Sequence, residues 1–202
     1  MVNKNIYTAI EHVDNLIGDI EEHIKNKQDF VAFILIALGI EFMGSFFDEK
    51  EFNVPGNSDS RFKNGITKLF KKGWYKNNAT WIYKQFRGPL IHQYRTGDEI
   101  LLSSVCKNNA PISEHLVLKK GKRVFILEGL FADFKEAVDR LKNITRLQKQ
   151  NHITSFKIEQ EYLVIAEIES TMDTSQINHN IPTYSVSGDT TAYGSSKKKK
   201  NK

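Results

Sequence analysis

The stretch that decides the fold is residues 30–47, which read FVAFILIALGIEFMGSFF. A helix that is hydrophobic all round is buried, either in the core of a protein or in a membrane. The stretch is just long enough to span a bilayer, but Glu41 would then lie near the middle of the span at an energetic cost. Gly39 and Gly44 favour a central core helix that packs closely on its neighbours, or a dimer seam. We therefore expect a helical protein without a membrane span.

Helical patterns continue on both sides of this stretch. Apolar residues recur at steps of three and four over residues 4–26, which predicts an amphipathic helix; they are Ile6, Ile10, Val13, Ile17, Ile20 and Ile24. Residues 48–60 contain a Pro-Gly pair among polar residues and predict a loop. Side-chain oxygens of Ser58, Asp59 or Ser60 can cap a third helix, which is expected to run to about Lys71.

A fourth helix is expected from residue 77 onward and leads directly to Arg87. Pro89 has no backbone N–H and its ring clashes with the carbonyl four residues earlier, so the helix should kink or end between Gln85 and Pro89. Aromatic residues are dense in this region: Trp74, Tyr75, Trp81 and Tyr83. They can stack on nucleic-acid bases, but aromatics interleaved with Leu and Ile are more typical of a core.

The second half of the chain adds strands. Residues 99–105 predict one strand, and residues 115–129, HLVLKKGKRVFILEG, predict two short strands joined by a turn at Lys120-Gly121-Lys122. Helical spacing over residues 130–149 predicts a closing helix, and residues 153–169 predict one or two more strands. We expect one mainly α domain over residues 1–169, a helical bundle with an appended β-hairpin or small antiparallel sheet and a closing helix.

Residues 170–202 differ from the rest in composition. Ser, Thr, Asn and Gly dominate, so the segment cannot bury enough apolar surface to order itself and is predicted to be disordered. It ends in a lysine run: Lys197, Lys198, Lys199, Lys200 and Lys202. These lysines either bind nucleic acid or acidic lipid nonspecifically or are simply solvated, and the sequence favours the second. Without them 24 basic residues balance 24 acidic ones, so a basic surface on the body requires local clustering.

Several classes of site are excluded or unsupported. Cys106 is the only cysteine, which excludes an intrachain disulfide and a multi-cysteine zinc site. The sequence shows no glycine-rich phosphate loop, serine elbow or cysteine–histidine metal motif, so we expect neither a cofactor nor a metal. No apolar signal-peptide core is visible, and we expect a cytoplasmic protein.

Arg87 and His92 are the candidate catalytic residues. Arginine is a permanent cation suited to phosphate, and histidine exchanges a proton near neutral pH. Their spacing alone is weak evidence of a catalytic site, because Arg146 and His152 form a similarly spaced pair. Residues five apart on a regular helix lie about 140° apart around its axis. Arg87 and His92 can therefore act on the same substrate only if the helix kinks at Pro89 or if a second subunit supplies one of them.

Both residues also have a structural interpretation. Arg87 can hydrogen-bond the last carbonyls of a helix, and His92 can be a satisfied, partly buried side chain. Glu41 is either a buried partner for Arg87 or a charge at a helix edge, and the sequence favours the second.

The order of three segments carries a family resemblance. A buried helix containing Ile40-Glu41-Phe42-Met43-Gly44 precedes a helix with Arg61-Phe62, and residues 81–92, WIYKQFRGPLIH, follow. Over residues 1–145 this order resembles the HEPN superfamily, the higher eukaryotes and prokaryotes nucleotide-binding domains. In catalytic members an arginine and a histidine with four to six intervening residues meet at a two-fold dimer interface. Arg87 and His92 match that pattern, whereas Gly88 stands where many catalytic members have a polar residue.

The resemblance implies a metal-independent endoribonuclease of the toxin or defence type. Arg87 would bind phosphate and His92 would transfer a proton at a homodimer interface. The expected RNA-binding residues are neighbours of this pair, although Tyr94 can pack on Pro89 instead: Lys84, Gln93, Tyr94 and Arg95. Expected partners are RNA and an antitoxin or other protein. The alternatives are a non-catalytic module of the same fold that binds RNA, a nucleotide or a protein, and, third, a membrane-associated protein.

Overall fold

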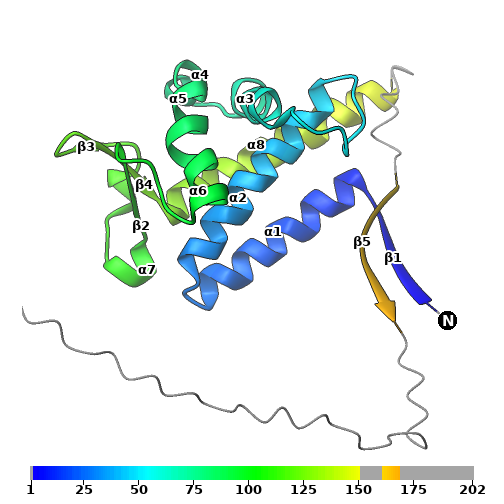
Figure 1. Cartoon of the computed structure of the whole chain (residues 1–202), viewed down its shortest axis with the longest axis horizontal. Helices are drawn as coiled ribbons and strands as arrows, with labels where there is room; N and C mark the ends of the chain where they lie inside the picture. Colours follow the sequence, from blue (N-terminus) through cyan, green and yellow to red (C-terminus); the bar gives the residue numbers. More distant parts are fainter. Residues whose placement is uncertain (1, 151–160, 169–202) are drawn as a thin grey trace, which may run out of the picture. The chain divides into compact units, whose positions relative to one another are not determined.

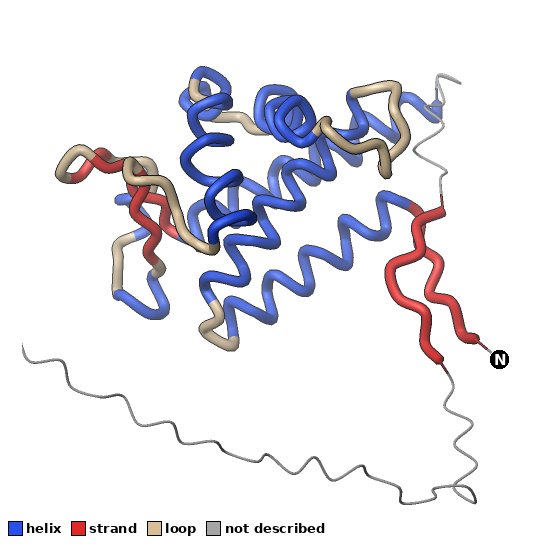
Figure 2. Tube along the Cα trace, in the orientation of Figure 1, coloured by secondary structure: helices blue, strands red, loops and turns tan. Residues whose placement is uncertain are grey.

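A computed structural model describes residues 2–150 and 161–168 of the chain, and helices dominate it (Figures 1 and 2). The prediction of a mainly α fold with a small sheet and a closing helix is confirmed. Residues 170–202, predicted to be disordered, lie outside the described residues, as does His152.

Helices α1 (Ala9–Lys25) and α2 (Asp29–Gly44) run antiparallel and side by side (Figure 1). The predicted first helix was wrong at its start, because Val2–Thr8 is a strand, β1, that contains Ile6. Thr8 and Glu11 explain where the helix begins. The Thr8 side chain accepts the Glu11 N–H and the Glu11 carboxylate accepts the Thr8 N–H, a capping box that satisfies two N-terminal donors.

Helix α2 lies in the core and contacts α1, α3 (Ser58–Leu69) and α8 (Leu127–Gln150). The predicted close packing is confirmed by two glycines. A Cβ atom on Gly44 would lie 1.7 Å from the Arg61 carbonyl oxygen, and one on Gly65 would lie 2.2 Å from the Ile40 carbonyl oxygen. Backbones of α2 and α3 therefore approach each other where side chains normally keep helices apart.

The apolar stretch also passes a simple test for a membrane span. Residues Asp29–Phe47, which include the 3₁₀ turn η1 (Ser45–Phe47), are long and apolar enough to cross a bilayer, and half of the segment is buried against other helices. A core helix and a membrane helix both pass this test. The absence of a membrane span therefore stays a prediction.

A run of short helical segments follows α3: α4 (Gly73–Asn77), α5 (Ala79–Ile82), the π-helical turn η2 (Tyr83–Arg87) and α6 (Gly88–Gln93). Aromatic side chains from α2, α3, this run, strand β4 (Lys122–Ile126) and α8 build much of the core. The largest buried aromatic side chains are Phe33, Phe62, Phe70, Tyr75, Phe86, Phe125 and Phe134.

Three strands form a small mixed sheet in the order β2-β4-β3. The predicted hairpin is confirmed: β3 (Leu118–Lys119) pairs antiparallel with β4 (Lys122–Ile126). Lys120 and Gly121 both have positive φ, 48° and 76°, as a two-residue type I′ turn requires.

The prediction of an antiparallel sheet was wrong for β2 (Ile100–Ser103), which pairs parallel with β4. Parallel neighbours need a long crossover. The segment with α7 (Val105–Asn108) and η3 (Ile112–Glu114) supplies it. Separately, β5 (Glu161–Ile168) pairs antiparallel with β1.

Candidate functional site

The helix around Pro89 does not end there but changes its winding. In η2 the Gly88 N–H bonds the Tyr83 carbonyl, five residues back, so one turn is wider than an α-turn. Pro89 has no N–H to offer the Gln85 carbonyl. That carbonyl accepts instead from Gly97 N–H at 2.7 Å. The irregularity lies where Pro89 predicted it, between Gln85 and Pro89, but the helix continues as α6 to Gln93.

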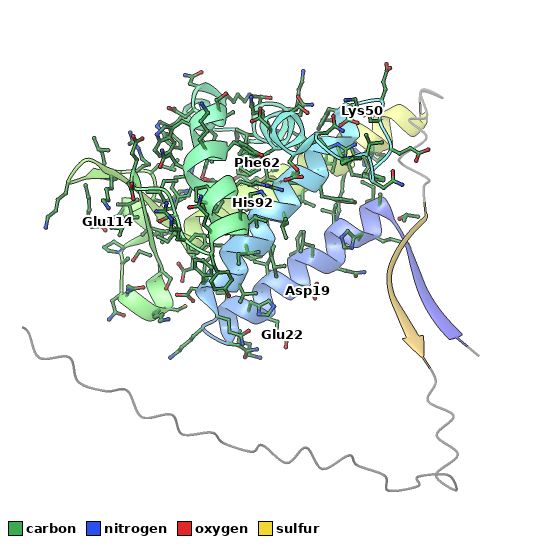
Figure 3. The ribbon with its side chains drawn as sticks, in the orientation of Figure 1. Asp19, Glu22, Lys50, Phe62, His92 and Glu114 are labelled. Carbon is green, nitrogen blue, oxygen red and sulfur yellow. The ribbon has the colours of Figure 1, made fainter. Side chains whose placement is uncertain are left out.

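Arg87 and His92 meet within one chain. Arg87 Nη1 lies 3.1 Å from His92 Nε2. The pair was expected to need a second subunit or a break at Pro89, because five helical residues separate the two Cα atoms by about 140°. Arg87 is the last residue of the wide turn, and its long side chain reaches around the helix to His92. Figure 3 shows His92 on α6.

The Arg87 guanidinium is buried and held from three sides. Its residue is 6% exposed. Nη2 lies 2.6 Å from Glu41 Oε2 and donates to Ser58 Oγ at 3.3 Å, and Cζ lies 5.7 Å from the centre of the Tyr83 ring. The Glu41 contact is an ion pair rather than an aligned hydrogen bond. The preferred interpretation of Glu41 as a helix-edge charge was therefore wrong.

Glu41 carried a signal that could have identified its partner. It is the only charged residue in the apolar stretch of residues 30–47, and a charge on a buried helix requires a counter-charge. Ser58 gave no such signal, since it was only one of three residues expected to be able to cap α3, with Asp59 and Ser60. Asn57 holds the cap position instead, and no side chain caps the helix.

The contact between the pair constrains the state of the histidine. A guanidinium has only donors, so His92 Nε2 accepts the hydrogen bond and the ring proton lies on Nδ1. His92 is exposed, whereas Arg87 is buried. In the described part of the chain Arg87 Nε has no hydrogen-bond partner. The site thus presents the His92 ring at the surface, next to a buried guanidinium with one unsatisfied donor.

The four predicted RNA-binding residues lie around the pair but not against it. Lys84 is exposed on η2. At the end of α6, Arg95 Nε donates to Gln93 Oε1 at 2.8 Å. Tyr94 is 70% exposed, and its ring packs on that of Phe30 in α2 with ring centres 4.6 Å apart. Its backbone N–H bonds the Pro89 carbonyl. Among the described contacts, none joins these four side chains to Arg87 or His92.

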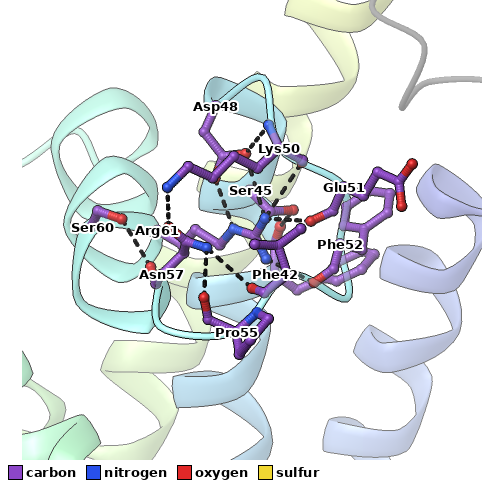
Figure 4. Close-up of polar contacts among 11 residues, drawn as sticks. Phe42, Ser45, Asp48, Lys50, Glu51, Phe52, Pro55, Asn57, Ser60 and Arg61 are labelled. Carbon is purple, nitrogen blue, oxygen red and sulfur yellow. Dashed lines mark hydrogen bonds and ion pairs between the residues drawn. The ribbon is translucent and has the colours of Figure 1, made fainter.

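A second arginine fixes the loop that leads to Ser58 (Figure 4). Arg61 is 6% exposed and clamps residues 48–52 from within α3. Nε donates to Asp48 at 2.7 Å, while Nη1 and Nη2 donate to the carbonyls of Phe52 at 2.7 Å and Glu51 at 2.6 Å. The clamp holds the entrance to α3 in place, and with it the Ser58 hydroxyl.

Glu41 also faces a groove of about 370 Å³ between α1 and α2. Its lining is mostly apolar, with a few polar residues: His12, Asp19, Ser45 and Arg61. Burial lowers the pKa of His12, although the Asp19 carboxylate acts in the opposite direction. Within residues 2–150 and 161–168, no three His, Cys, Asp or Glu side chains gather closely enough to hold a metal ion.

Comparisons with protein-family models, with curated proteins and with solved structures return no match for this chain.

Proposed function

We propose that the chain is a metal-independent endoribonuclease of the HEPN type that works as a homodimer. The observation that supports this best is the 3.1 Å contact between Arg87 and His92 at a π-helical turn. Such turns occur mostly as single interruptions of α-helices and are frequent at functional sites. The unsatisfied Nε of the buried Arg87 adds support, because orphaned buried donors need an explanation.

The proposed chemistry uses the RNA's own 2′-hydroxyl. A phosphate oxygen draws Arg87 Nη1 away from His92, which frees the lone pair of Nε2. His92 Nε2 then takes the hydroxyl proton, the 2′-oxygen bonds the adjacent phosphorus, and the bond from phosphorus to the 5′-oxygen breaks. The leaving oxygen takes up a proton, and a 2′,3′-cyclic phosphate and a 5′-hydroxyl end remain. General base catalysis contributes about 10²- to 10⁴-fold. Arg87 offsets the charge that develops on the phosphoryl oxygens.

One chain contributes one histidine to this site, whereas the reaction needs a base and an acid. A second copy supplies a second exposed His92, which is why a homodimer belongs to the proposal. Transesterification by the 2′-hydroxyl of the RNA needs no metal when side chains supply the base, the acid and the charge stabilisation, so cleavage is expected to continue in EDTA.

A non-catalytic binding module is the second candidate. The observation that favours it is the burial of Arg87 against Glu41, since this ion pair neutralises the guanidinium before any phosphate arrives. Such a module would bind RNA, a nucleotide or a protein and leave RNA intact.

Incubation of the protein with mixed single-stranded RNA in EDTA separates these candidates. We expect cleavage with 2′,3′-cyclic phosphate ends, reduced at least about 100-fold in His92→Ala. His23→Ala is the matched control, because His23 also lies near a helix end, and it should cleave like the unmodified protein. Intact RNA, or equal cleavage by His92→Ala, would overturn the proposal and leave the binding module.

A further inference from the structure

A second cavity, of about 210 Å³, lies between the β3–β4 hairpin and helices α4 and α5. Aromatic and charged side chains line it together with the tip of the hairpin: Trp74, Trp81, Glu99, Leu118, Gly121 and Arg123. Pockets that enclose drug-sized ligands measure about 300–1,000 Å³. This cavity therefore suits a single planar ring system.

Two tryptophans give the cavity faces and edges on which a ring can stack. Trp74 and Trp81 meet edge to face with ring centres 5.9 Å apart, and both are partly exposed. The guanidinium of Arg123 lies 5.0 Å above the Trp74 ring. Tyr75 is fully buried, as expected of a core aromatic, but its neighbour Trp74 is not. Stacking on exposed aromatics and arginine is how proteins hold single-stranded bases.

Positive charge gathers around the same cavity. Residues 71–76, KKGWYK, and 119–123, KKGKR, together hold seven Lys and Arg and no acidic residue. The stacking of Arg123 on Trp74 shows that the fold brings the two segments together. Lys72 and Lys119 pair with Asp133 and Glu114. Four further lysines are exposed: Lys71, Lys76, Lys120 and Lys122. Local clustering thus produces a basic surface on an otherwise neutral body.

Buried hydrogen bonds hold the two walls of the cavity in register. The Tyr75 hydroxyl lies 2.7 Å from His115 Nε2 and donates to Asp133 at 2.8 Å. His115 Nδ1 in turn accepts the N–H of Ile126, on β4, at 3.1 Å. Helix α4 and strand β4 are therefore linked through one histidine. A cavity fixed in this way needs little reorganisation to accept a ligand.

We propose that this cavity binds a base of single-stranded nucleic acid while the surrounding lysines contact the phosphates. Glu99 adds a preference among bases. One of its carboxylate oxygens accepts the Trp81 indole N–H, and the carboxylate retains acceptor capacity for an N–H of the base. Cytosine offers an amino donor where uracil has a carbonyl oxygen, so cytosine is favoured. This site is independent of cleavage at Arg87 and His92.

Intrinsic fluorescence tests the site directly, because Trp74 and Trp81 are the only two tryptophans of the chain. The probe is an RNA oligo(C) of about ten nucleotides, within the length that one binding surface covers. Full-length His92→Ala protein prevents cleavage during the titration. We expect saturable quenching that weakens as salt is raised. Inorganic polyphosphate has the charges but no base, and should compete for binding without quenching.

Charge reversal localises the contact. Lys120→Glu with Lys122→Glu should lower the affinity for oligo(C) about tenfold or more, since both lysines flank the cavity. Lys25→Glu with Lys27→Glu makes the same change in charge at the end of α1 and should have a much smaller effect. Oligo(U) should bind about fivefold more weakly than oligo(C).

Three results would overturn the inference: binding without quenching, equal loss in the two double variants, or equal affinity for oligo(C) and oligo(U). The first two would assign binding to the lysine-rich end of the chain or to charge in general. Absence of RNA cleavage would leave this inference intact, because the titration does not depend on it.

Discussion

Glu41 and Arg87 form a buried ion pair across two helical segments, with Oε2 and Nη2 2.6 Å apart and side chains 18% and 7% exposed. The pair ties the apolar helix α2 to the wide turn η2. It therefore links the element that forms the core to the element that carries the proposed chemistry.

Removal of either partner of this ion pair should destabilise the fold. Glu41→Ala leaves the guanidinium buried without its counter-charge, and the free energy of unfolding should fall by about 3–5 kcal/mol. Glu41→Leu combined with Arg87→Met removes both charges and should recover most of that loss. Urea denaturation of the two variants checks this. A loss in the double variant as large as in Glu41→Ala would contradict the view that the cost comes from an uncompensated buried charge.

The crossing of α2 and α3 depends on glycine. Gly44→Ala or Gly65→Ala would drive a methyl group into a carbonyl oxygen of the facing helix, and either should destabilise by about 3 kcal/mol. Gly18→Ala is the matched control on α1, because no atom lies within 4 Å of the new Cβ. That substitution should raise the melting temperature, since alanine favours helix by up to about 1 kcal/mol. Unchanged melting of Gly44→Ala would contradict the close crossing.

The Arg61 clamp should be visible in proteolysis. Arg61→Met removes the hydrogen bonds to Asp48, Glu51 and Phe52, so stability should fall by about 3 kcal/mol and residues 49–56 should be cut first. Lys63→Met, which breaks only an exposed pair with Asp59, should cost less than about 0.5 kcal/mol. Limited proteolysis followed by mass spectrometry locates the cut. First cleavage elsewhere in both variants would argue against the clamp.

Asp133 makes stability depend on pH. Burial raises the pKa of its carboxyl, but hydrogen bonds from His115, Lys72 and Tyr75 more than offset this, and the pKa lies below its ordinary value of 3.8. A lowered folded pKa gives stability that is present above pH 3.8 and lost as the pH falls through the folded value. Asp133→Asn should cost about 2 kcal/mol at neutral pH.

The decline below pH 3.8 should also be flatter in Asp133→Asn than in the unmodified protein. Denaturation by urea at a series of pH values measures both effects. Glu136→Gln changes an exposed carboxylate on the same helix and should leave the pH dependence as it was. If the free energy of unfolding of Asp133→Asn fell with the same slope in acid as that of the unmodified protein, Asp133 would not be the source of the pH dependence.

Local patterns predicted most helices and the hairpin well. The closing helix α8 follows from apolar spacing, and the turn at Lys120-Gly121 follows from the residues that tolerate positive φ. Strand β1 was missed because Ile6 fits the helical spacing of the residues after it, whereas its pairing with β5 depends on residues far along the chain.

Long-range pairing also explains the remaining errors. The strand at Ile100 was predicted, but its parallel partner is set by the path of the crossover and not by its own residues. The candidate pair Arg87 and His92 was found in the sequence, yet their contact depends on Glu41 and Ser58, which anchor the arginine from two other helices. No short-range pattern encodes such anchors.

The π-helical turn Tyr83–Arg87 is in effect a helix with one extra residue. The extra residue is absorbed within this one turn. Deletion of one residue between Tyr83 and Gly88 would leave the same N–H and carbonyl bonded in a regular α-turn, so α6 would keep its direction. The helix can therefore lose a residue at this turn, whereas a deletion within the regular winding of α3 would rotate everything after it by about 100°.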